Sequence, residues 1–172
     1  MSNIEIFKHD SGMKVIYDYD ETANTVDISL SVGVGSINES PEERGIAHFI
    51  EHVLFTGTDN RTKEQLTYDL AQTGASSNAY TTFHETCYQT KTMIGNASLG
   101  LDIMCDMVSS ANFLENNVEI ERSVILQELN DGKSNPDYFS IRAFYENIYK
   151  NKEMSVETIG TKDIVSRLTR YD

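Results

Sequence analysis

Polar and apolar residues alternate along the N-terminal part of the chain, and clusters of Asp, Ser, Gly and Asn separate the alternating runs. A period of two is typical of a strand with one buried and one solvated face, and such clusters favour turns. A later stretch rich in Thr and Tyr alternates in part on both sides of Phe83-His84, which predicts a hairpin. The expected strands cover residues 4–8, 13–19, 25–34, 76–82 and 85–94.

The other segments repeat their apolar residues every three or four positions, which is the period of an amphipathic helix. Proline followed by two acids at residues 41–43 predicts the start of the first helix. Further helices are expected at residues 62–72, from Asn96 or Ser98 to about residue 110, at 114–132 and 137–149, and after Gly160-Thr161. A chain of 172 residues without a repeat or a linker then predicts one α+β domain over residues 1–172, with helices packed on a mostly antiparallel sheet.

The first helix carries two histidines four positions apart, with a glutamate beside the second: His48, Glu51 and His52. Four helical residues correspond to about 40° of rotation and about 6 Å of rise, so both imidazoles can reach one ion. An H-x-x-E-H pattern is typical of zinc hydrolases, in which the histidines bind zinc and the glutamate is the general base. An amphipathic helix with a solvated polar face is the alternative. The expected core stripe of this helix consists of Ile46, Phe49, Ile50, Val53 and Leu54.

A catalytic zinc ion needs a third protein ligand, because one of its four positions is kept for water. Glu128 is the best candidate, on a helix that turns Val118, Ile125 and Leu129 to one face. Glu121 lies two turns earlier, about 10 Å away along the same helix, so the two carboxylates cannot easily be equivalent ligands. One would bind the metal and the other would orient a ligating histidine, unless both are surface carboxylates.

The sequence around the two histidines resembles the active-site helix of the pitrilysin/insulinase metallopeptidases, in particular the branch that contains mitochondrial processing peptidase. The resemblance covers residues 45–58, the upstream Gly35-Ser36 and Glu39, and the downstream segment 121–128. It implies zinc as the cofactor, with His48, His52 and Glu128 as ligands. It further implies Glu51 as the general base and Glu121 as the carboxylate that orients a ligand.

The resemblance also implies how a peptide substrate is bound. Asn78, Ala79 and Tyr80 match the family's strand beside the metal, whose free edge pairs with an extended peptide. Strand addition satisfies the backbone of the peptide and demands little of its side chains, so broad sequence tolerance is expected. An ordinary hairpin with a covered edge is the alternative. His84 is left out of the site, because a histidine in a turn is more often solvated than ligating.

Family members resemble a clamshell of several homologous domains, each longer than this chain. The resemblance therefore implies an incomplete domain, without its last strand or strands, and a second homologous domain or subunit as partner. That partner half is expected to help stabilise the reacting carbonyl. The leading hypothesis is thus a zinc-dependent endopeptidase acting on extended peptides or unfolded segments. The alternatives are a non-catalytic peptide-binding or scaffold subunit and a metal-buffering module.

Composition limits the other partners. The chain has 14 Lys and Arg against 27 Asp and Glu, a formal charge of −13, which argues against nucleic acid and anionic membranes. A basic peptide partner fits the acidity, but solubility is the more common reason for an acidic surface. No apolar run approaches the roughly 20 residues of a membrane span.

The two cysteines and the N-terminus predict the compartment. Cys87 and Cys105 do not form a disulfide framework, and Cys105 falls in the apolar pattern of Leu101, Met104 and Val108, which predicts a small core residue. The first residues lack the basic and apolar runs of a secretory leader and the Arg-rich character of a transit peptide. A cytoplasmic protein is therefore expected.

Overall fold

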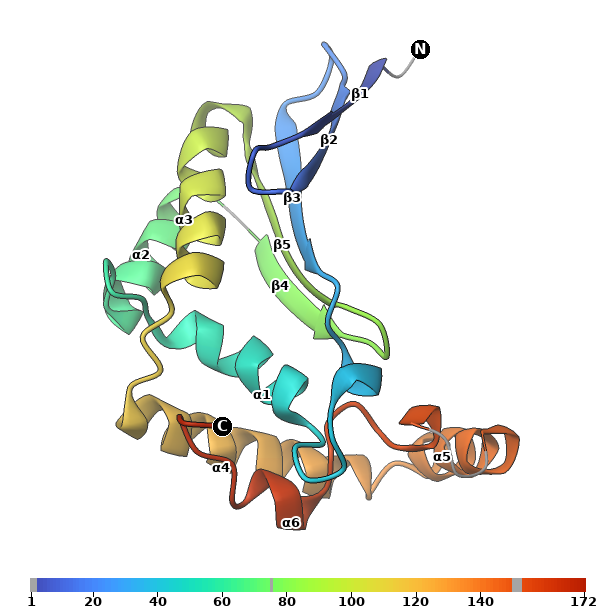
Figure 1. The fold of residues 1–172 in the computed structure, drawn as a ribbon. Helices are drawn as coiled ribbons and strands as arrows, with labels where there is room; N and C mark the ends of the chain where they lie inside the picture. The colour runs from blue at the N-terminus through green and yellow to red at the C-terminus, as the bar shows by residue number, and fades with distance from the viewer. Residues whose placement is uncertain (1–2, 75, 150–152) are drawn as a thin grey trace.

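The computed structural model describes residues 3–74, 76–149 and 153–172 (Figure 1). Two antiparallel sheets lie in its N-terminal half. The first pairs β1 (Asn3–Lys8) with β2 (Lys14–Tyr19), and the second has the order β3-β5-β4, with β3 (Thr25–Val32), β4 (Ser76–Thr81) and β5 (Thr86–Met93). The sequence prediction of antiparallel strands and of the hairpin at Phe83-His84 is confirmed. β4 is an edge strand of its sheet in the described part of the chain.

The helices cover one side of the three-stranded sheet and continue below it (Figure 1). They are α1 (Ile46–Val53), α2 (Lys63–Gln72), α3 (Ala97–Ser110), α4 (Glu115–Gly132), α5 (Pro136–Ile148) and α6 (Lys162–Val165), with 3-10 turns η1 (Ser36–Asn38), η2 (Leu54–Thr56), η3 (Ile94–Asn96) and η4 (Glu153–Ser155). These bounds agree with the α+β prediction to within a few residues, apart from the start of α1. None of the helices that the structure describes combines the length and apolar character needed to cross a bilayer.

Two apolar clusters form the core, and α1 lies between them. The first joins α1 to α4 and α6 and contains the buried residues Phe49, Val53, Val118, Ile125, Leu129, Val165 and Leu168. The second joins η2, α2 and α3 to β5 and contains Leu54, Leu66, Tyr88, Ile103, Met104 and Met107. The predicted apolar face of α4 is confirmed, because Val118, Ile125 and Leu129 are all buried.

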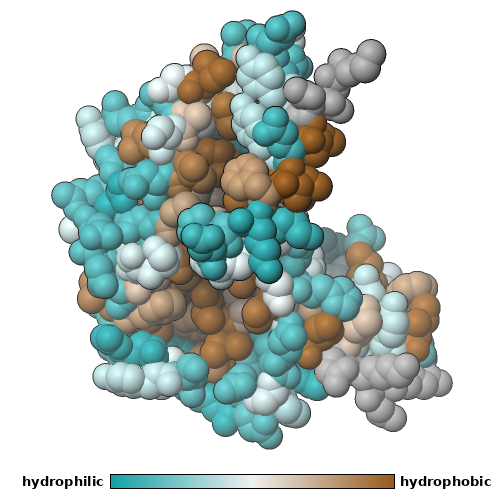
Figure 2. All heavy atoms as spheres, turned by 45° about the horizontal axis from the view of Figure 1, so that its top comes forward, coloured by the Kyte–Doolittle hydropathy of each residue, from teal (hydrophilic) through white to brown (hydrophobic). Residues whose placement is uncertain are grey.

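The apolar side chains of the β1–β2 hairpin, in contrast, are exposed to solvent. Ile6 and Ile16 face each other across the two strands and remain 65% and 64% exposed. Apolar residues accordingly gather on the surface beside the N-terminal end of the chain (Figure 2).

Three details of the sequence prediction were wrong. α1 begins at Ile46 rather than near residue 41, because residues 41–45 form turns that end with Gly45 in the left-handed region (φ 98°). Ile50 is 37% exposed and does not belong to the core stripe. Cys105 is exposed, whereas Cys87 is buried.

The error at Cys105 is one of helical phase. α3 packs on the sheet through Gly100, Ile103, Met104 and Met107, all of which are buried. A Cβ at Gly100 would lie 3.3 Å from a methyl group of Thr92, so the helix approaches β5 closely on that face. Cys105 and Leu101 therefore point away from the sheet, and Leu101 is 51% exposed.

Candidate metal centre

The helix that carries both histidines is buried over most of its surface. Ala47, Phe49 and Val53 contact the core, and Glu51 on the opposite face is also buried. The polar face that the sequence predicted is therefore not a solvated one. Burial of a carboxylate and two imidazoles is costly unless they find partners, so the surroundings of each decide what the site can do.

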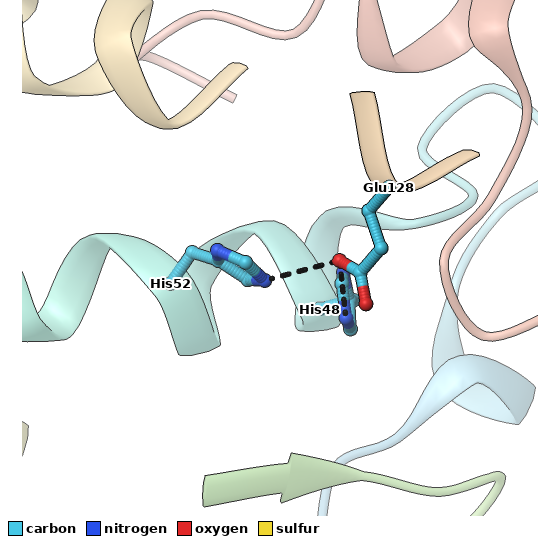
Figure 3. A group of neighbouring side chains, drawn as sticks. All are labelled: His48, His52 and Glu128. Carbon is cyan, nitrogen blue, oxygen red and sulfur yellow. Dashed lines mark ion pairs between the residues drawn. The ribbon is translucent and has the colours of Figure 1, made fainter. Parts of the chain in front are cut away.

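The structure brings Glu128 of α4 beside His48 and His52 of α1 (Figure 3). Glu128 Oε2 lies 3.9 Å from His48 Nε2 and 3.6 Å from His52 Nε2. One ligand atom from each of the three side chains lies within 4.8 Å of the others. Of the described residues, this is the only group of three or more His, Cys, Asp or Glu side chains with such an arrangement.

The donor set fits a zinc ion, and two of its three ligand spacings are close to those around bound zinc. Zinc takes His nitrogen and carboxylate oxygen at about 2.0 to 2.2 Å in a tetrahedral site, which places neighbouring ligand atoms roughly 3.3 to 3.6 Å apart. The two nitrogen–oxygen distances of 3.6 and 3.9 Å are close to this range. Three protein ligands of this kind would leave a fourth position for water.

The second nitrogen of each histidine has a different environment. Nδ1 of His52 lies 3.5 Å from Glu121 Oε2, and Glu121 Oε1 lies 3.3 Å from Lys63 Nζ. A carboxylate on the second nitrogen fixes the orientation of a ligating imidazole, which is the arrangement expected for Glu121. Nδ1 of His48 is buried and has no hydrogen-bond partner among the described residues.

Burial sets the protonation of His48. Desolvation, together with the neighbouring His52, lowers the pKa of His48 to about 4. The ring is therefore neutral at neutral pH, so its contact with Glu128 is not an ion pair there. A neutral imidazole is the form that binds a metal.

Glu51 lies on the same helix with its carboxylate held by the sheet. Its Oε2 accepts a hydrogen bond of 2.6 Å from Thr81 Oγ1 at the end of β4. Burial raises the pKa of Glu51, while the bond from Thr81 and the nearby His52 oppose the rise. A raised pKa brings a carboxylate closer to the range in which a general base works best.

The three predicted substrate-binding residues lie in the middle of β4. Asn78 and Tyr80 are on its exposed face, and Ala79 is on the other face, packed against the second core cluster. Thr81 shares the face of Ala79, which explains how it reaches Glu51 in α1. His84 is exposed in the β4–β5 turn and is not part of the metal cluster.

The sequence analysis gave no role in the site to three neighbours of the cluster: Thr81, Lys63 and Glu39. The alternation of β4 could have indicated Thr81, because it shares a strand face with Ala79. The position of Lys63 follows from the packing of separate helices. Glu39 accepts hydrogen bonds from the first amides of α1, Gly45 N at 2.8 Å and Ala47 N at 2.9 Å.

Comparison with known proteins agrees with this geometry. Residues 14–162 match the insulinase family, peptidase family M16. The chain belongs to this family. The resemblance found in the sequence is thereby confirmed.

The relatives of this M16 chain include named proteases. It is 33% identical over 168 residues to an uncharacterized zinc protease of Rickettsia bellii. The alignment covers 98% of this chain and 41% of the relative. It is 30% identical over 162 residues to a probable mitochondrial-processing peptidase subunit beta of Arabidopsis thaliana, covering 94% of this chain and 30% of the relative. The chain thus spans less than half the length of these curated relatives.

A solved structure is also similar. A protease from Helicobacter pylori superimposes with a TM-score of 0.93 at 26% identity, over 99% of this chain and 42% of that one. The relatives support peptidase chemistry and zinc for the family in general.

Proposed function

We propose that this chain carries the metal centre of a zinc-dependent endopeptidase. The observation that supports this most directly is the approach of Glu128, from a distant helix, to the two Nε2 atoms of α1. His48, His52 and Glu128 would hold the ion. Glu121 would orient His52 through its Nδ1 atom, 3.5 Å away.

The chemistry then follows from the neighbours of the site. Zinc, when bound, lowers the pKa of water and polarises a carbonyl group. Glu51 would accept a proton from the attacking water and deliver it to the departing amine. Thr81 holds Oε2 of Glu51 and leaves the other carboxylate oxygen for that proton.

Extended peptides or unfolded segments are the proposed substrates, bound at the free edge of β4. A peptide added to this edge would lie beside the strand whose Thr81 contacts the proposed base. Main-chain hydrogen bonds to every second residue along the stretch Asn78-Ala79-Tyr80 would fix its register with little demand on sequence. The exposed side chains of Asn78 and Tyr80 would contact alternate residues of the peptide.

A second homologous domain or subunit is proposed as partner. The relatives are more than twice as long as this chain, so groups that stabilise the reacting carbonyl can come from the remaining part. Turnover by this chain is therefore expected to increase when such a half is supplied. A cytoplasmic location stays a prediction from the sequence.

Metal analysis and peptide cleavage test the proposal together. The purified chain is expected to contain one equivalent of zinc and to cleave an unstructured peptide until a chelator removes the metal. Glu51→Gln should keep zinc while cleavage falls about 10²- to 10⁴-fold, because the amide cannot accept the proton. Cleavage that survives chelation, or a Glu51→Gln variant with the parent rate, would contradict the assignment. Zinc and peptide binding without cleavage, also when the second half is supplied, favours the non-catalytic peptide-binding subunit.

A further inference from the structure

The helix with the histidines lacks a capping side chain at its own N-terminus. Its N-cap is Gly45, which makes no side-chain hydrogen bond. The first amides of a helix have no partner within the helix and need an acceptor from elsewhere. Here the acceptor is Glu39, whose Oε2 takes the amide of Gly45 at 2.8 Å and whose Oε1 takes that of Ala47 at 2.9 Å.

Glycine is required at position 45 by both conformation and space. Its φ is 98°, and a Cβ there would lie 2.6 Å from the carbonyl oxygen of Ile159. The segment at Gly160 also passes close to the start of α1, because a Cβ at Gly160 would collide with Arg44 O. A Ser, Thr or Asp cap at position 45 is therefore not available to α1, which explains why the acceptor comes from six residues upstream.

The segment before Glu39 is attached to the end of the proposed substrate strand. Ser36 N donates to Thr82 O at 3.2 Å, and Ile37 N donates to Phe83 O at 3.0 Å, in the turn that follows β4. A Cβ at Gly35 would lie 2.5 Å from Thr82 O, so the two segments are in close contact. Residues 35–39 thus join the β4–β5 turn at one end to the start of α1 at the other.

We propose that Glu39 is a positioning residue of the metal centre, which acts through the first turn of α1 to hold the ring of His48 in place. The inference rests on the proposed zinc site. Ala47 N, one of the two amides bound by Glu39, directly precedes His48. Without that bond the first turn can fray, and His48 would move relative to His52, which lies one turn further inside the helix. The negative charge of Glu39 also stabilises the N-terminal end of the helix dipole.

A matched control separates this role from ordinary helix capping. Asn135 caps α5 with its side chain, which accepts a hydrogen bond from Asp137 N at 2.9 Å. α5 contributes none of the residues of the metal cluster. Asn135→Ala therefore removes a side-chain cap, with one amide bond where Glu39 has two, without touching α1.

Titration with Co²⁺, which replaces zinc and gives visible absorption bands that depend on ligand geometry, is the test. The full 172-residue chain, Glu39→Ala, Glu39→Gln, Asn135→Ala and His48→Ala are titrated in parallel, and the unfolding of each metal-free protein by urea is recorded. We expect Glu39→Ala to bind Co²⁺ about 10- to 100-fold more weakly, with altered bands, as for other residues that orient ligands. Glu39→Gln should lie between it and the parent, because its amide keeps one acceptor oxygen. Asn135→Ala should lower the urea midpoint but leave the Co²⁺ affinity within about twofold of the parent.

Two outcomes would overturn the proposal and are distinct from each other. If Glu39→Ala unfolds more easily but binds Co²⁺ with the parent affinity and spectrum, Glu39 is only a cap. If Glu39→Ala fails to fold, Glu39→Gln is compared with the parent in the same way. Co²⁺ binding of Glu39→Gln with the parent affinity and spectrum would then reject the positioning role of Glu39. If the parent chain itself binds no Co²⁺ or zinc and equals His48→Ala, the metal centre is rejected, and the role of Glu39 with it.

Discussion

Two clusters of acidic side chains in this molecule have their positive charge in different places. In the first, here called the Arg61 cluster, the guanidinium of Arg61 contacts Asp69, Asp102 and Asp106 at 3.1, 2.5 and 2.5 Å. The buried carboxylate of Asp106 also accepts hydrogen bonds from Thr58 at 2.8 Å and Asn60 at 2.7 Å. A permanent cation and two neutral donors thus satisfy the one buried acid.

The metal cluster has acids without such a cation. Glu51, Glu121 and Glu128 surround two imidazoles, and His48 is neutral at neutral pH because burial lowers its pKa to about 4. Of the ion pairs in the described residues, only Lys63 brings a Lys or Arg to these carboxylates, and it contacts Glu121. The buried acid of the Arg61 cluster therefore has a cation within the chain, whereas Glu51 and Glu128 beside the imidazoles have no Lys or Arg partner among the described residues, and a divalent cation would supply the missing positive charge.

The largest effect expected from this contrast is stabilisation by zinc. At a free zinc concentration about 1,000 times the dissociation constant, the free energy of unfolding should rise by about 4 kcal/mol. His52→Ala should lose this gain, while Arg61→Met should keep it. Thermal unfolding with zinc and with a chelator measures the effect. An equal zinc-dependent gain in His52→Ala would mean that the ion binds elsewhere.

Removal of the cation from the Arg61 cluster comes next. Arg61→Met leaves Asp106 buried without its opposite charge, which should lower the free energy of unfolding by about 3 kcal/mol. Zinc affinity should stay the same, because the cluster shares no residue with the metal centre. Urea unfolding and a zinc titration of the same variant check both statements. A fall in zinc affinity as large as the loss of stability would show that the two clusters are coupled.

Acid should weaken the Arg61 cluster. Burial alone raises the pKa of Asp106, but hydrogen bonds from Asn60, Thr58 and Arg61 outweigh it and hold the pKa below the ordinary value of 3.8. The carboxylate therefore contributes stability above about pH 4, and this contribution is lost as the pH falls through the folded-state pKa. Asp106→Asn should be less stable than the parent by about 2 kcal/mol at neutral pH.

Urea midpoints of the parent and of Asp106→Asn between about pH 3 and pH 7 measure this contribution. The difference between the two proteins should shrink towards the acid end, because Asp106 then becomes protonated in the parent. The other acidic groups titrate in both proteins, so their effect cancels in the difference. A difference that stays constant over the whole range would assign the stability to the shape of the side chain and not to its charge.

The smallest effect is expected at Lys63. Its contact with Glu121 joins a side chain that is 45% exposed to one that is 12% exposed, so it contributes less than about 1 kcal/mol. Lys63→Met should change zinc affinity by less than about fivefold, because the loss of a nearby positive charge favours the ion while Glu121 loses a contact that positions it, and added salt should reduce the charge effect further. Zinc titrations at low and high salt test this. A loss as large as that of a ligand variant would make Lys63 part of the metal centre.

Local sequence patterns predicted the elements well but misplaced some of their faces and ends. The period of α3 indicates a helix, yet its buried face runs through Gly100 and Met107 and leaves Cys105 exposed. The periodicity alone could not decide this, because the close approach of Gly100 to Thr92 sets the rotation of the helix. The start of α1 was misplaced for a similar reason, since its cap comes from Glu39 and not from a residue beside the helix.

By itself, the sequence determined that His48, Glu51 and His52 share one side of a short helix, because spacing within a helix is fixed by its geometry. It also indicated the antiparallel hairpin and the identity of the distant Glu128. The tertiary structure alone decided that the carboxylate of Glu128 reaches both imidazoles, that Thr81 holds Glu51, and that Arg61 pairs with the buried Asp106 in a separate acidic cluster. These contacts join residues far apart in the chain, and the packing of α1 between two apolar cores brings them together.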